Sequence, residues 1–173
     1  MPVSSTELLA PWHDFFILIG TAAATLIGAM FVVVSIGMGF LSPNRPAAIR
    51  VFLSTTVIHL TTVLFGSMLV MVPVWTPRTQ ALVAGVAGLA GVGYSVHVIW
   101  GFRQHPGTVL SDWCWYAIFP LAAYAVLAGA AGLGLYDIVG GLDLFAAVLT
   151  VLLIAGIRNA WDMLVFLATR ERT

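Results

Sequence analysis

The sequence predicts an all-α, polytopic integral membrane protein: a compact bundle of five transmembrane helices that forms a single membrane domain over residues 1–173. Two observations predict this class. Hydrophobic residues make up 61% of the chain and charged residues only 8%, whereas a typical soluble domain carries about 25% charged residues. The few charges also lie far apart and leave long apolar runs between them. We therefore expect the lipid bilayer to surround this chain.

Four of the five helices are predicted from runs of residues that carry no charge. These runs contain thirty, twenty-seven, twenty-four and twenty-four residues and lie at 15–44, 51–77, 79–102 and 113–136. Each is long enough to cross a bilayer, because about 20 apolar residues suffice, and an ionised side chain at its centre costs about 2.5–3.5 kcal/mol. Segments containing proline or glycine separate the runs. The predicted helices lie, in order, near 12–40, 48–72, 78–102 and 111–136.

The fifth helix, predicted near 143–169, crosses only if it takes charge into the membrane. Fourteen residues separate Asp143 from Arg158, which is too short a run to span a bilayer. Thirteen Leu, Ile, Val and Phe residues in this segment contribute roughly −6 kcal/mol, against about +6 kcal/mol for Arg158 and Asp162 at the bilayer centre. The two charges are four residues apart, so they can pair on one face of the helix.

The arginines predict the orientation of the bundle. Five crossings place the two termini on opposite faces, and six of the seven arginines fall toward one face, with Arg78 toward the other. The positive-inside rule then places the N-terminus outside and the C-terminus in the cytoplasm. The chain begins without the basic segment of a cleaved signal or an organellar presequence. With the compact size, this predicts a multi-pass protein of the bacterial inner membrane.

Composition also excludes several function classes. The seven basic residues are all arginine and balance seven acidic residues, so no basic patch for nucleic acid is expected. The absence of lysine excludes a retinal Schiff base and a P-loop. Cys114 is the single cysteine, which excludes an intrachain disulfide and a thiolate metal cage. Neither HExxH nor GxSxG occurs, so we expect neither a catalytic residue nor a metal site.

Small residues recur at helical spacing on the first and third predicted helices. Such stripes allow helix backbones to approach closely in a membrane. They predict either packing within one chain or self-association of several copies into a homo-oligomer, and both can hold together. The two stripes consist of Gly20, Ala24 and Gly28, and of Gly85, Gly88 and Gly91.

Polar side chains within the spans are the candidate site, because such residues are costly in a membrane and usually face the bundle interior. Measured along each helix from the nearest cytoplasmic arginine, His59 lies about 14 Å deep, His97 about 9 Å and Asp162 about 12 Å. These similar depths predict one hydrogen-bonded cluster in the cytoplasmic half of the bilayer. Its predicted members are Thr55, His59, Tyr94, His97, Arg158, Asn159 and Asp162.

The same residues also have structural interpretations. A buried pair of Arg158 and Asp162 can simply hold helices together, because breaking such a pair leaves an uncompensated charge. His59 can be a core histidine that is hydrogen-bonded to neighbouring threonine hydroxyls. Alternatively, it can relay a proton or an ion, or hold a cofactor.

Three functions follow from these patterns. The first is a small channel or transporter that passes an ion or proton through the polar cluster and needs no cofactor. The second is a b-type haem electron carrier with His59 and His97 as ligands, whose depths differ by about 5 Å. The third is an accessory or scaffold subunit of a larger membrane complex, in which partner helices shelter Arg158.

Overall fold

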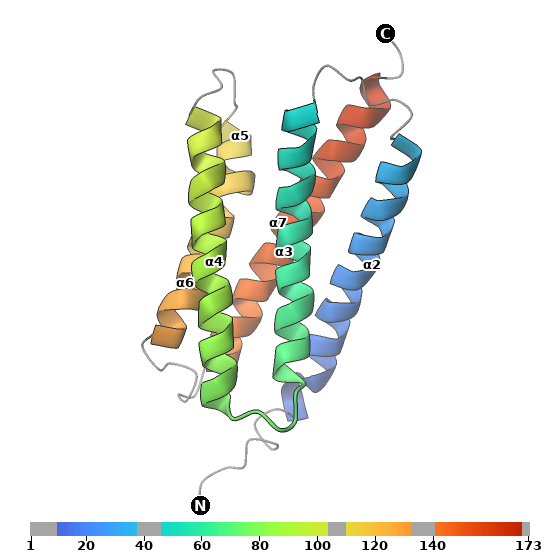
Figure 1. Ribbon diagram of the computed structural model, residues 1–173. Coiled ribbons are helices and arrows are strands. Elements are labelled where there is room, and N and C mark those ends of the chain that lie inside the picture. Colours follow the sequence, from blue (N-terminus) through green and yellow to red (C-terminus); the bar gives the residue numbers. More distant parts are fainter. Residues whose placement is uncertain (1–9, 38–45, 104–109, 133–140, 171–173) are drawn as a thin grey trace, which may run out of the picture.

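The computed structural model describes residues 10–37, 46–103, 110–132 and 141–170, and all the regular structure in these ranges is helical. Figure 1 shows the helices side by side as a bundle. The all-helical prediction is therefore confirmed for the described residues. In chain order the elements are η1 (Ala10–Trp12), α2 (His13–Gly37), α3 (Pro46–Val70), α4 (Pro77–Arg103), α5 (Leu110–Trp113), the π-helical segment η2 (Cys114–Ile118), α6 (Phe119–Gly132) and α7 (Gly141–Arg170).

Four of the long helices lie where the uncharged runs predict them, and α7 lies where the fifth, charge-containing span is predicted. Because α5, η2 and α6 follow one another without a break, they form the single helix expected near 111–136. At the ends that the structure describes, the predicted and observed bounds differ by one or two residues. The predicted helix ends at residues 40 and 136 lie outside the described residues. Charged and helix-breaking residues thus mark the ends of these helices well.

Four helical stretches are long and apolar enough to cross a membrane: His13–Ser35, Pro77–Arg103, Leu110–Ala131 and Gly141–Val165. In α3, the part with described side chains is apolar but shorter, Ser54–Val70. Large apolar side chains, including Leu18, Phe31 and Val86, are exposed on the outside of the bundle. Such an apolar exterior is compatible with a multi-pass membrane protein.

Helix α7 holds the bundle together, because it packs against α2, α3 and α6. It crosses behind α3 in the view of Figure 1, while α6 lies behind α4. Helix α4 packs most extensively on α6, and α3 packs on α2 and α7. The start of α2 and the end of α7 lie at opposite ends of the bundle. The main core lies among α2, α3, α6 and α7, with Phe16, Val63, Tyr124, Leu149 and Leu152 at its centre.

The glycines of α4 allow α6 to approach closely. Gly85, Gly88 and Gly91 are all buried. A Cβ atom on Gly88 would lie 2.6 Å from the backbone nitrogen of Ala128, and one on Gly91 would overlap the ring of Tyr124. This small-residue stripe is therefore covered by α6 within the same chain, as the first of its two interpretations predicts.

The small-residue stripe on α2 is only partly covered by another helix of the same chain. A Cβ atom on Gly20 would lie 3.0 Å from the Cβ of Ser67 on α3, so this glycine packs within the chain. Ala24 is exposed, and Gly28 has no atom within 4 Å of its Cβ position. Self-association through the outer part of this stripe therefore stays a prediction.

Pro120 explains the π-helical segment within the fourth long helix. A proline has no N–H group, and its ring clashes with the carbonyl group one turn earlier in an α-helix. Here the Phe119 N–H donates to the Cys114 carbonyl oxygen, five residues back, so the helix widens just before Pro120. The wider turn carries the buried side chain of Tyr116. Single-turn π segments of this kind are frequent at functional sites.

The side chain of Gln80 on α4 caps the C-terminal end of α3. Its Nε2 donates to the carbonyl oxygens of Leu69 (3.0 Å), Val70 (3.4 Å) and Val72 (3.5 Å). The last carbonyl groups of a helix have no partner within the helix.

We expect Gln80→Ala to lower the free energy of unfolding by about 1 kcal/mol, measured by thermal unfolding in detergent. Arg78→Ala, at an exposed position of the same turn, should leave the midpoint unchanged; equal midpoints for both variants would contradict the capping role.

Candidate functional site

His59 lies in the interior of the bundle and is fully buried. Its Nδ1 atom is 3.0 Å from the hydroxyl oxygen of Tyr124 on α6. The Tyr124 hydroxyl also lies 3.2 Å from Oγ1 of Thr62, one turn from His59 on α3. These three side chains, which we call the histidine relay group, join α3 to α6 through hydrogen bonds.

Proton counting fixes the role of each member of the histidine relay group. The Thr62 hydroxyl donates its one proton to the Ile58 carbonyl oxygen at 2.9 Å, so it accepts from the Tyr124 hydroxyl. Tyr124 then has no second proton to give, and His59 Nδ1–H must donate to its oxygen. His59 Nδ1 therefore carries a hydrogen. Because the ring is fully buried and burying an unpaired charge is costly, the neutral form is favoured, and in that form Nε2 bears the lone pair.

The Nε2 atom of His59 is buried and has no hydrogen-bond partner within the described part of the chain. An unprotonated ring nitrogen is a hydrogen-bond acceptor and a base. The site thus presents a basic nitrogen inside the bundle, at a position where a free lone pair is costly.

Thr55 and Tyr94 form a second polar contact, between α3 and α4. The two hydroxyl oxygens are 2.8 Å apart. Thr55 is buried and lies four residues before His59, so it is about 6 Å nearer the N-terminal end of α3. The structure therefore brings Thr55 and Tyr94 together between α3 and α4, one helical turn along α3 from His59.

His97 lies outside this arrangement. Its side chain is exposed, whereas Ser95 and Val98 on the same helix are buried. At about 100° per residue, position 97 falls on the side of α4 that points away from α6. The two proposed haem ligands therefore do not face each other, because His59 is enclosed and bonded to Tyr124 while His97 points outward. This placement does not favour the haem alternative.

Arg158 and Asp162 form an ion pair with each other on α7. Their side chains are 40% and 32% exposed, and within the described residues neither forms a hydrogen bond to His59. The structure therefore does not join this pair to the predicted cluster. The reason is helical rotation: Asn159, the residue after Arg158, is the one that is buried.

Asn159 faces the interior and is held near α5 and η2. Its backbone oxygen accepts a hydrogen bond from the Tyr116 hydroxyl at 3.4 Å. Both polar atoms of the Asn159 side chain are buried and have no partner in the described part of the chain. Of the polar run predicted on the last helix, Asn159 is thus the residue that reaches the interior.

Sequence reasoning did not select Tyr124, Tyr116 or Ser95. All three are buried, and two of them are tyrosines within an uncharged run. A tyrosine buried in an apolar segment usually needs a partner for its hydroxyl group. The presence of tyrosines in the uncharged run is therefore the sequence feature that could have indicated a polar site. Its partner on another helix could not be identified without the packing.

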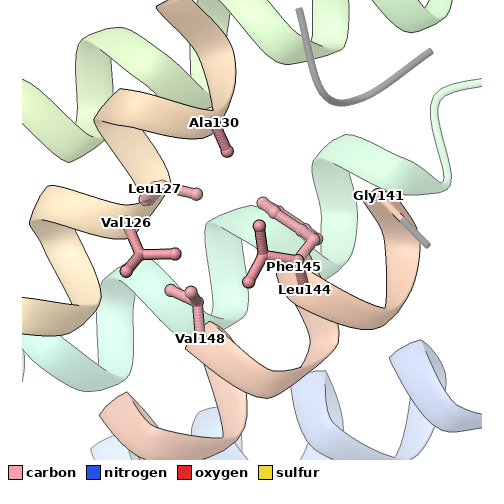
Figure 2. A pocket seen from close by; sticks show the side chains of 7 residues that line it. All are labelled: Val126, Leu127, Ala130, Gly141, Leu144, Phe145 and Val148. Atoms are coloured by element: carbon pink, nitrogen blue, oxygen red, sulfur yellow. The ribbon is translucent and has the colours of Figure 1, made fainter. Parts of the chain in front are cut away.

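A shallow pocket between α6 and α7 is separate from these polar residues. Figure 2 shows Val126, Leu127 and Ala130 of α6 facing side chains of α7. The remaining lining residues are Gly141, Leu144, Phe145 and Val148. Because the lining contains no polar side chain, this pocket offers no chemistry, and the candidate site lies in the packed interior instead.

Metal ligation is not supported by the arrangement of the described residues, since no three His, Cys, Asp or Glu side chains gather among them. Comparisons with protein-family models, with curated proteins and with solved structures gave no match.

Proposed function

We propose that this protein is a small membrane channel or transporter that passes protons through its interior, with His59 as the group that takes up and releases the proton. The observation that carries this proposal is the fully buried imidazole whose Nε2 atom has no hydrogen-bond partner among the described residues. Histidine is the side chain whose ordinary pKa lies nearest physiological pH. A buried free base of this kind is more readily explained by proton transfer than by packing.

The histidine relay group provides the next step for the proton. When Nε2 accepts a proton, an N–H bond forms there and the ring becomes an imidazolium ion. Nδ1 can then pass its proton to the Tyr124 oxygen while Tyr124 passes its own to Thr62. The transfer is complete when Thr62 turns its hydroxyl hydrogen from the Ile58 carbonyl oxygen to a water molecule, which takes the proton away. Thr62 is half-buried, so it is the least enclosed member of the group.

The membrane topology around the site is proposed from the distribution of the arginines along the chain. All five long helices would cross the bilayer of a bacterial inner membrane, with the N-terminus outside. Arg103 ends α4 at the same end of the bundle as the end of α7, which supports a cytoplasmic location for that end. The exposed outer part of the α2 stripe, with Ala24 and Gly28, leaves room for a homo-oligomer.

The two histidines of the spans allow a matched test. We expect His59→Gln to reduce proton flux by about 100-fold or more, because glutamine cannot carry the proton. The flux is measured in liposomes that contain the protein and enclose a pH-sensitive dye. His97→Gln should leave the flux unchanged, since His97 is exposed and makes no hydrogen bond within the described residues. Wild-type flux in His59→Gln, or loss of flux in both variants, would contradict the proposal.

The same preparations separate the alternatives. A visible haem absorbance that disappears in both histidine variants would favour the electron carrier. A well-folded wild-type protein that passes neither protons nor other ions would favour the accessory subunit.

A further inference from the structure

Three buried side chains, each from a different helix, have polar atoms without a hydrogen-bond partner among the described residues. These atoms are His59 Nε2 on α3, Ser95 Oγ on α4, and Nδ2 and Oδ1 of Asn159 on α7. All three residues are at least nine-tenths buried. Leaving one such group unsatisfied costs about 1–3 kcal/mol. Several of them in one small bundle indicate a common partner.

The packing of α4 places Ser95 at a defined level. Gly91, one turn before Ser95, lies against the ring of Tyr124. Val98, one turn after Ser95, belongs to a cluster with Tyr116. Ser95 therefore lies between the levels of the two tyrosines, which are eight residues apart on the neighbouring helix.

The packing of α7 places Asn159 at the same level. Gly156, one turn earlier, has its Cβ position 4.0 Å from the Cβ of His59, and His59 is bonded to Tyr124. The backbone oxygen of Asn159 accepts from Tyr116. Asn159 thus also lies between the levels of Tyr124 and Tyr116, in the same layer of the interior as Ser95.

Pro120 of the fourth long helix is fully buried and lies midway between Tyr116 and Tyr124 along the chain. The layer between the two tyrosines therefore receives polar side chains from α4 and α7 and adjoins His59 on α3.

We propose that this layer binds a small cluster of water molecules, held by His59 Nε2, Ser95 Oγ and the Asn159 carboxamide, and that this water delivers protons to His59. The inference depends on the proposed function, since it names the proton donor to the same imidazole. A buried water molecule typically makes about three hydrogen bonds to protein groups. Here the imidazole accepts, the serine hydroxyl donates and accepts, and the carboxamide does both through separate atoms.

The proton transfer balances without a further reactant. A protonated water molecule gives one proton to Nε2: an O–H bond breaks, an N–H bond forms, and neutral water remains. The proton on Nδ1 then leaves toward the Tyr124 oxygen, and the imidazole is neutral again, now with its hydrogen on Nε2 and its lone pair on Nδ1. Asn159 and Ser95 are positioning residues in this scheme, because they hold the water and do not take up the proton themselves.

Water-edited solid-state NMR of the labelled full-length protein in bilayers tests the proposal, with water itself as the probe. We expect magnetisation to pass quickly from water to the His59 ring and the Asn159 side-chain amide. Leu152 is buried in the core on α7, the same helix as Asn159. Its methyl groups should receive the magnetisation slowly. If His59 and Asn159 receive it as slowly as Leu152, the proposal is overturned.

Two serines provide a matched pair of variants. Ser95→Ala should slow the water transfer to His59 and reduce proton flux by about tenfold, as expected for the loss of one hydrogen bond to the water. Ser67→Ala should change neither quantity, because buried Ser67 already donates to the Val63 carbonyl oxygen at 2.9 Å. Identical behaviour of the two variants would overturn the proposal, and Asn159→Leu provides a second test from another helix.

The two measurements separate the two proposals. Rapid water transfer to His59 in a protein without proton flux would contradict the proposed function and leave the water site intact. Proton flux that depends on His59, without water transfer to it, would contradict only the water site.

Discussion

Gly88→Ala is expected to destabilise the bundle by about 2 kcal/mol, although alanine is the better helix former. The added Cβ would lie 2.6 Å from the backbone nitrogen of Ala128 and 3.0 Å from its Cα. These are backbone atoms, so no side-chain rotation relieves the overlap and α6 as a whole must move away. The steric cost therefore exceeds the roughly 1 kcal/mol that alanine gains in helix propensity.

Gly93→Ala is the matched control on the same helix. No atom lies within 4 Å of its Cβ position, so only the helix propensity acts, and we expect a change of up to about 1 kcal/mol toward greater stability. Thermal unfolding in detergent, followed by tryptophan fluorescence, measures both variants. Shifts of the same sign would show that α4 and α6 are not in close contact.

Arg158→Leu is expected to have the second large effect, because it leaves the Asp162 carboxylate without its partner. Removing one member of a buried pair costs about 3–5 kcal/mol. Since these side chains are 40% and 32% exposed, we expect a smaller loss, about 1–3 kcal/mol. The measurements are the unfolding midpoint in detergent and the yield of folded protein.

The double variant Arg158→Leu/Asp162→Leu separates a structural role of this pair from a role in transport. Removing both charges should restore most of the stability, since no uncompensated charge remains. Proton flux should persist, because within the described residues neither side chain is hydrogen-bonded to His59. A stable double variant that no longer passes protons would instead place the pair in the proton pathway.

The helices could be predicted from the sequence because charge and length are local properties. For four of the five helices, an uncharged run of more than about 20 residues between charged or helix-breaking residues defines a helix that can cross a bilayer. The fifth is predicted from its apolar residues and from the spacing of Arg158 and Asp162, which can pair on one helix face. His59 could be selected for a similar reason, because it is a polar residue within such a run, and the structure buries it fully. Its partner Tyr124 comes from another helix and was not identified.

The membership of the predicted polar cluster could not be obtained from the sequence in the same way. Residues at similar depth need not share a face, and depth along a helix says nothing about rotation around it. His97 and the ion pair lie at depths compatible with His59, yet His97 is exposed and the ion pair is partly so. Asn159, next to Arg158, turns inward instead.

The sequence by itself determined that this protein is helical and apolar, where its helices lie, and which polar residues are costly within them. Only the tertiary structure decided which of those residues meet. It pairs His59 with Tyr124, covers the α4 glycines with α6, and assembles Ser95 and Asn159 at one level. The physical reason is that helix formation depends on neighbours along the chain, whereas hydrogen bonds between helices depend on their rotation and register. Those two quantities are set by the packing of all the helices together.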